Sequence, residues 1–285
     1  MVSILRYIVF LTLYPCFIHF CLSQKQQDDE IWTPNPEVEL PKAMIICYRD
    51  VSTQERNECI KNSMKSLLPT MKNGIPSLGV PDFDPYKIKK TVIEFNTGQI
   101  SSKSVMKNAL ISGFSRAQVK NVRTKINDRK MYIEIDMKIP ELTTQAQYKG
   151  SGGFNELRVN STGWMKVTLN KMSGTWKFLG EIENIQGEDY MIFKKFDIDN
   201  LAIKNMQINA TGLFPDPDVN SLVLEFINQY WESLYQQVLP QMKSVWEPIT
   251  LGSVNKFFAH VPFRRLMPKQ EMKPKSESDE LKKVK

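Results

Sequence analysis

The chain has 285 residues and a mild basic excess, with a formal net charge of +7. This length fits one large domain or two small ones. No recognised nucleic-acid-binding motif accompanies the positive charge, so nucleic acid is not expected as a partner.

Residues 1–23 are predicted to be a secretory signal peptide. Arg6 provides the basic start, an apolar core of about 15 residues follows, and Cys21-Leu22-Ser23 places small residues at the cleavage site. A membrane anchor is the alternative, but Pro15, His19 and the short apolar run argue against a spanning helix. We therefore expect a secreted, extracellular protein.

The N-terminal part of the mature chain is predicted to be a short helix fixed by a disulfide. Residues 24–41 are polar with several prolines and should form an extended leader. Cys47 and Cys59 then pair by default in an exported protein, with two free thiols as the alternative. The capping box Ser52-Thr53-Gln54-Glu55 begins an amphipathic helix that Asn73-Gly74 ends.

From Ile88 to about Ala210 the apolar residues alternate with polar ones, most clearly from Met131 to Ile139. Turns are expected at four places: Asn127-Asp128, Gly150 to Gly153, Met172 to Gly174, and Gly187 to Asp189. No helical stretch interrupts this region, so it predicts an antiparallel meander with one apolar face and excludes a parallel α/β sheet.

The C-terminal region is predicted to contain one long helix. Asp216-Pro217-Asp218 begins it, and apolar residues on almost every side of the helical wheel extend to Trp246. Such a helix should be enclosed by other elements. Val254 to Val261 could form a last strand, and the charged residues 269–285 should be a disordered tail.

Together these elements predict an α+β fold, in which a long C-terminal α-helix is wrapped by a highly curved antiparallel β-sheet. Residues 42–268 would form this single lipid-binding domain. A curled sheet closes poorly at the ends of a helix, and unfilled apolar space there suits an apolar ligand. The alternative is an interior that methionine and aromatic side chains fill completely.

Two surface features are open to more than one interpretation. The basic segment from Lys120 to Lys125, with Arg129 and Lys130 beyond it, is either a solvated strand face or a patch for anionic lipid head groups or an acidic partner. Asn160 and Asn209 lie in glycosylation acceptor sequences, which can be used if they are exposed.

Catalytic and metal-binding residues are scarce, so we expect no enzyme, cofactor or metal site. Gly113-Phe114-Ser115-Arg116-Ala117 faintly resembles a nucleophile elbow but lacks its last glycine and its strand-to-helix context. His260 is the single histidine of the mature chain. Two paired cysteines and one histidine cannot build a zinc site.

In order and spacing, several sequence features resemble the takeout and haemolymph juvenile-hormone-binding family of secreted insect proteins. They are the Cys47 and Cys59 pair, the loop from Gly74 to Pro85, the glycine-rich stretch before Phe154, and Phe226 to Trp231. The resemblance implies an internal tunnel for an elongated hydrophobic ligand, an isoprenoid such as juvenile hormone or a fatty lipid. A second cysteine pair of the hormone-binding members is missing, which favours the takeout-like branch.

We therefore predict a monomeric carrier of a small hydrophobic ligand, with an anionic membrane surface or a receptor as its other partner. The residues expected to line the tunnel are large aromatic side chains: Phe154, Trp164, Trp176, Phe178, Phe226, Tyr230, Trp231 and Tyr235. Two rival hypotheses are a membrane-docking lipid-transfer protein and a packed signalling or structural protein without a ligand.

Overall fold

The computed structural model describes residues 34–270 except 97–99 and 155–156. The predicted signal peptide and most of the predicted tail lie outside the described residues. Val38, in the predicted leader, is buried and packs into the core.

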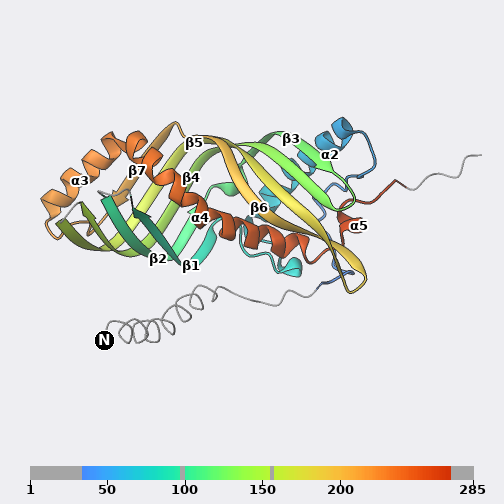
Figure 1. Cartoon of the computed structure of the whole chain (residues 1–285), viewed down its shortest axis with the longest axis horizontal. Coiled ribbons are helices and arrows are strands. Elements are labelled where there is room, and N and C mark those ends of the chain that lie inside the picture. The colour runs from blue at the N-terminus through green and yellow to red at the C-terminus, as the bar shows by residue number, and fades with distance from the viewer. Residues whose placement is uncertain (1–33, 97–99, 155–156, 271–285) are drawn as a thin grey trace, which may run out of the picture. The chain divides into compact units, whose positions relative to one another are not determined.

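In the described residues, one antiparallel sheet of seven strands is built around a long hairpin of β4 (Lys130–Phe154) and β5 (Leu157–Ile185) (Figure 1). The path through the sheet is β1-β2-β4-β5-β6, while β3 pairs with β4 and β7 pairs with β5. These other strands are β1 (Tyr86–Asn96), β2 (Ile100–Ser112), β3 (Gln118–Ile126), β6 (Glu188–Ala202) and β7 (Asn205–Ala210).

Two of the predicted turns are wrong because the hairpin strands run through them. Gly150 to Gly153 lie inside β4, where a Cβ on Gly150 would be 2.5 Å from the Ser104 hydroxyl of β2. Glycine here permits a close approach of neighbouring strands, not a turn. Met172 to Gly174 lie inside β5, where Lys171 has φ 53° and the pairing with β6 shifts register after Ser173. This irregularity is a bulge.

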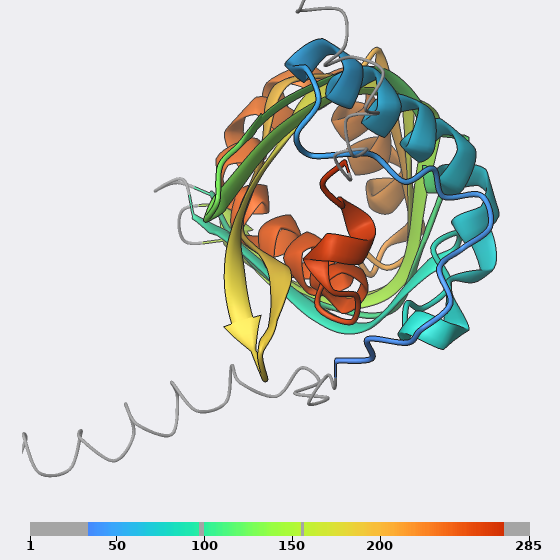
Figure 2. The same ribbon diagram turned by 90° about the vertical axis from the view of Figure 1, so that its right-hand side faces the viewer.

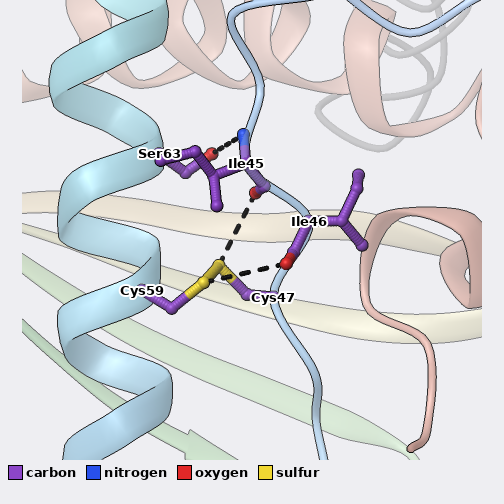
Figure 3. The surroundings of a disulfide bond; sticks show 5 residues. All are labelled: Ile45, Ile46, Cys47, Cys59 and Ser63. Carbon is purple, nitrogen blue, oxygen red and sulfur yellow. Dashed lines mark hydrogen bonds between the residues drawn. A yellow bond between two sulfur atoms is a disulfide. The ribbon is translucent and has the colours of Figure 1, made fainter.

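The predicted N-terminal helix and its disulfide are confirmed. α2 (Thr53–Leu67) begins at Ser52, whose hydroxyl accepts from the Glu55 N–H at 3.2 Å. The 3₁₀ helix η1 (Leu68–Asn73) continues it to Gly74, which has φ 69°. Cys47 and Cys59 form the predicted disulfide, and beside it the Ser63 hydroxyl accepts from the Ile45 N–H at 3.0 Å (Figure 3). Short 3₁₀ turns follow at η2 (Pro76–Leu78) and η3 (Phe114–Arg116).

The C-terminal helix differs from the prediction in two ways. It is divided into α3 (Pro217–Gln229) and α4 (Trp231–Phe258) at Tyr230, which has φ −108° and ψ 22°. The last strand is also wrong, because α4 runs through Val254 to Phe258 and the short α5 (Phe263–Leu266) follows. A short apolar run such as this one fits the spacing of a helix as well as that of a strand.

α4 closes the curved sheet by packing against both β6 and β1. Its Ser253 hydroxyl donates to the Tyr86 hydroxyl of β1 at 2.8 Å, and Asn255 hydrogen-bonds the backbone of Phe193 in β6. Figure 2 shows the strands curving around these C-terminal helices. The predicted fold class is therefore confirmed, although the helix is not enclosed on every side.

Candidate ligand-binding site

α4 has one face toward solvent and one toward the concave side of the sheet. The solvent face consists of exposed residues at helical spacing: Ser233, Gln236, Pro240, Lys243, Pro248 and Gly252. The opposite face, called the inward face below, consists of Trp231, Tyr235, Val238, Leu239, Met242, Val245, Trp246 and Ile249. Every inward-face residue is apolar or aromatic, and every one is only half-buried.

One end of the interior is filled by closely packed aromatic rings. Phe178 lies 4.7 Å from Phe196 and 5.5 Å from Phe193 between ring centroids, and Phe193 lies 4.9 Å from Phe258 of α4. These rings belong to a large cluster of buried residues, the dense core, that also contains Met131, Ile133, Ile135, Met137, Met191 and Val261. The dense core leaves little room for a ligand at this end.

The other end of the interior has a smaller cluster, called the sparse core. Its buried members are mostly modest in size: Ile88, Met106, Ala109, Ala146, Tyr148 and Ala210. Leu224 of α3 and Ile249 of α4 pack against it while remaining partly exposed. The helices are therefore less tightly packed at this end. Of the inward face, Ile249 packs against the sparse core and Trp246 against the dense core.

Two polar atoms are buried on the inward face without a hydrogen-bond partner among the described residues. They are Oη of Tyr235 and Nε1 of Trp246. Burial raises the pKa of Tyr235 to about 12, so the phenol stays neutral even well above physiological pH. A third such atom, Nε of Arg49, belongs to a guanidinium that lies 5.3 Å from the centroid of the Phe263 ring.

Seven of the eight predicted lining residues fall into three groups. Trp231 and Tyr235 share the inward face of α4, with ring centroids 6.4 Å apart. Phe178 is buried in the dense core, and Trp176 packs against that core. Phe226, Tyr230 and Trp164 are exposed by 55%, 48% and 41%, and the first two contact each other at 4.8 Å. Phe154 is the last residue of β4, and its side chain lies outside the described part.

Sequence reasoning did not select Met242 and Trp246 as site residues, although both share the inward face with Tyr235. They follow Tyr235 by about two and three helical turns. This repeat was available in the sequence. It was hidden because the assumed helix began at Pro217 and showed apolar residues on nearly all sides.

The basic segment of β3 is partly neutralised by neighbouring strands. Arg123 donates to Glu134 at 2.7 Å and to Asp136 at 2.6 and 3.0 Å, while Lys130 lies 3.0 Å from Glu181. The Arg123 guanidinium lowers the pKa of Asp136 to about 2. These contacts favour a solvated strand face for this part of the segment.

The residues that suggested a nucleophile have a structural role. The Ser115 hydroxyl and backbone N–H donate to the Asp84 carboxylate at 2.5 and 2.9 Å, and the Gly113 N–H donates to it at 2.9 Å. His260 donates through Nδ1 to the Lys256 carbonyl. Within the described residues, no group of three or more His, Cys, Asp or Glu side chains could hold a metal ion.

A cleft of about 420 Å³ lies between α2 and β3, away from α4. Its walls include Asn57, Glu58, Lys61 and Arg123. Such polar and charged walls do not suit an apolar ligand. The inward face of α4 is therefore the better candidate.

The fold and the site define a class of α+β protein in which a C-terminal helix closes a curved antiparallel sheet over an apolar interior. The sequence profile of the haemolymph juvenile hormone binding protein family matches residues 17–268. The chain therefore belongs to this family. None of the described helices combines the length and the apolar character that a membrane span requires.

Individual relatives are distant but cover most of the chain. The circadian clock-controlled protein daywake of Drosophila melanogaster is 22% identical over 219 residues, which is 74% of this chain and 84% of that protein. Daywake of Drosophila yakuba is 20% identical over 73% of this chain and 83% of its own length. The crystal structure of Takeout 1 from Epiphyas postvittana has a TM-score of 0.64 at 23% identity, and the match covers 79% of this chain and 99% of that one. At this identity the structural similarity establishes the fold alone.

Proposed function

We propose that the protein is a secreted, monomeric carrier that holds one elongated hydrophobic ligand, an isoprenoid or a fatty lipid, between α4 and the sheet. The observation that carries this proposal is the inward face of α4. A row of large apolar side chains faces the sheet yet stays half-buried from Trp231 to Ile249. An interior filled only by protein would bury such residues more completely.

Burial of apolar surface would supply the affinity. A ligand that hides about 400 Å² of apolar surface, at about 25 cal/mol per Å², gains about 10 kcal/mol before association costs. Half-buried methionine and aromatic side chains adapt to ligands of different shape. The same surface supplies no nucleophile or acid–base pair, which agrees with carriage and not with catalysis.

Secretion is supported by three independent features. Residues 1–23 have the pattern of a signal peptide. Cys47 and Cys59 form a disulfide, which persists in oxidising compartments. Membership of a haemolymph protein family agrees with both. Asn160 and Asn209 have exposed side chains, so both acceptor sequences are open to glycosylation.

The direct test is to identify the ligand. The protein purified from a eukaryotic secretion host is extracted with organic solvent, and the extract is analysed by mass spectrometry. We expect a lipid in about equimolar amount, and we expect a fluorescent fatty probe to bind the extracted protein and to be displaced by the recovered lipid. No recovered lipid together with no probe binding would reject carriage.

A second candidate function is lipid transfer at a membrane surface, and an exposed apolar stripe on α3 favours it. Val219, Leu222, Phe226 and Tyr230 are exposed by 41%, 66%, 55% and 48% and recur along one side of the helix. α3 also packs against the sparse core through Leu224. A bilayer contact there would bring lipid close to the proposed site.

Vesicle sedimentation distinguishes transfer from carriage in solution. A transfer protein should sediment with vesicles, more strongly with anionic ones if the basic segment contributes, and less in high salt. Replacing Leu222 and Phe226 by Glu should abolish that sedimentation while probe binding in solution is retained. A protein that binds its lipid but never sediments is a carrier only.

A further inference from the structure

The buried polar atoms of Tyr235 and Trp246 are placed to contact a ligand along its length. Both residues belong to the inward face of α4, about three turns apart, which is about 16 Å along the helix axis. Neither Oη of Tyr235 nor Nε1 of Trp246 has a hydrogen-bond partner in the described residues. Buried polar groups of native proteins are rarely left unpaired.

The chemistry of these two atoms fixes what can pair with them. An indole N–H is a donor only, so Trp246 requires an acceptor. The Tyr235 phenol is protonated at physiological pH, as any tyrosine with an ordinary or raised pKa is, and it can therefore donate as well. An uncharged oxygen of an ester, ketone or ether satisfies either donor.

The inward face of α4 offers no positive charge to an anionic head group. The inward face from Trp231 to Ile249 contains no charged residue among those described. Arg56 is the buried cation of the described residues, and it is engaged between α2 and β3, where its Nε donates to the Thr124 hydroxyl at 3.0 Å. An ionised carboxylate buried against α4 would lack a counter-ion, which is strongly unfavourable.

We propose that the site selects neutral lipids carrying acceptor oxygens, and that Tyr235 and Trp246 recognise such oxygens at two separate points along the ligand. Ionised fatty acids are then poor ligands. This inference rests on the proposed carrier function and deepens it, because it names the ligand class and the residues that set the specificity.

The test compares three ligands with the same hydrocarbon length: methyl palmitate, palmitate and hexadecane. Affinities are measured by displacement of a fluorescent probe from the full-length mature protein at about pH 7, where palmitate in water is ionised. We expect the affinity for the ester to exceed the affinity for palmitate by at least about 10-fold. Lowering the pH toward about 5 should strengthen palmitate binding, because protonation removes the charge.

Variants then separate recognition from packing. Tyr235→Phe and Trp246→Phe each remove one donor. The single ester group of methyl palmitate can reach only one of the two, so one variant should weaken its binding by about 3- to 10-fold, while hexadecane affinity stays unchanged in both. The ligand-free Tyr235→Phe protein should melt at the same temperature or higher, since an unpaired buried hydroxyl has been removed. If the hydroxyl were needed only for folding, the variant would melt at a lower temperature than the wild type.

The outcomes separate the two proposals. If palmitate at about pH 7 binds as tightly as its methyl ester, or if both variants bind the ester like the wild type, the selectivity proposal is rejected. The carrier function would survive that result. If ester, acid and hydrocarbon all fail to bind, the carrier function itself fails.

Discussion

The side-chain amide of Asn255 hydrogen-bonds both backbone groups of Phe193. Its Oδ1 accepts from the Phe193 N–H at 2.8 Å, and its Nδ2 donates to the Phe193 carbonyl at 2.9 Å. Asn228 of α3 makes the same pair of bonds with Ile208 of β7, at 2.7 and 2.8 Å. Two asparagines thus satisfy strand edges that would otherwise be open, and they fix the helices to the sheet.

Replacing Asn255 by Leu should destabilise the protein strongly. Phe193 is buried, so its backbone N–H and carbonyl would lose both partners without access to water. We expect a loss of about 2–4 kcal/mol in the free energy of unfolding, measured by urea denaturation.

Asn228→Leu is the matched control, because Ile208 is only half-buried and water can replace the amide. Its loss should be smaller, about 1 kcal/mol. Equal stability of Asn255→Leu and the wild type would show that these bonds do not hold α4 in place.

The asparagine pairs also show where sequence reasoning stops. Alternating residues such as Met131 to Ile139 predict strands, and the capping box at Ser52 predicts the start of a helix, because both signals are local. The attachment of Asn255 to Phe193 joins distant parts of the chain, and no local pattern indicates it. The sequence likewise gives no local sign of the break at Tyr230. Proline is the usual signal of a helix break, but Pro240 and Pro248 lie within α4 without ending it.

Asp84 should make the protein sensitive to acid. Burial raises the pKa of this carboxyl, but the hydrogen bonds from Ser115 and Gly113 outweigh it, and the net shift is downward. A carboxyl with a lowered folded pKa stabilises the fold above its unfolded pKa of about 4, and this stabilisation is lost as pH falls through the folded value. Asp84→Asn should therefore be less stable at neutral pH and show a smaller loss below about pH 4.

Ser115→Ala tests the cause of that shift. It removes the hydroxyl donor while leaving the carboxylate, so the pKa of Asp84 should rise and the acid transition should begin at a higher pH. Denaturation midpoints across a pH series measure both variants. Parallel pH profiles for all three proteins would contradict the assignment.

The disulfide should stabilise the N-terminal segment against α2. Cys47 and Cys59 are 12 positions apart, and closing a loop of this size contributes about 3 kcal/mol in the chain-entropy model. The Cys47→Ser, Cys59→Ser double variant should lose about that amount in urea denaturation. Dithiothreitol should lower the urea midpoint of the wild type and leave that of the double variant unchanged. If the wild-type midpoint stays the same after the disulfide is fully reduced, the prediction is contradicted.

The candidate site was predicted less well than the fold. Aromatic size and family resemblance selected Phe226 and Tyr230, which the structure leaves exposed on α3 and at the break after it. The inward face depends on the phase of a helix that begins at Trp231 and not at Pro217. A shift in the assumed start and a break in the helix both change which residues point toward the sheet, so large side chains alone could not identify the lining.

Met242→Trp tests whether the inward face borders space for a ligand. Met242 is half-buried on the side of α4 that faces the sheet. If a lipid occupies that space, the larger indole should fill it, so the stability of the extracted protein should change by less than about 1 kcal/mol while probe affinity falls by about 10-fold or more. If protein atoms already fill it, overpacking should cost about 1–3 kcal/mol without any ligand effect, which is the outcome expected of a packed protein. Gln236→Trp on the solvent face is the control and should change neither property. A stable Met242→Trp protein that binds the probe like the wild type would place the ligand elsewhere.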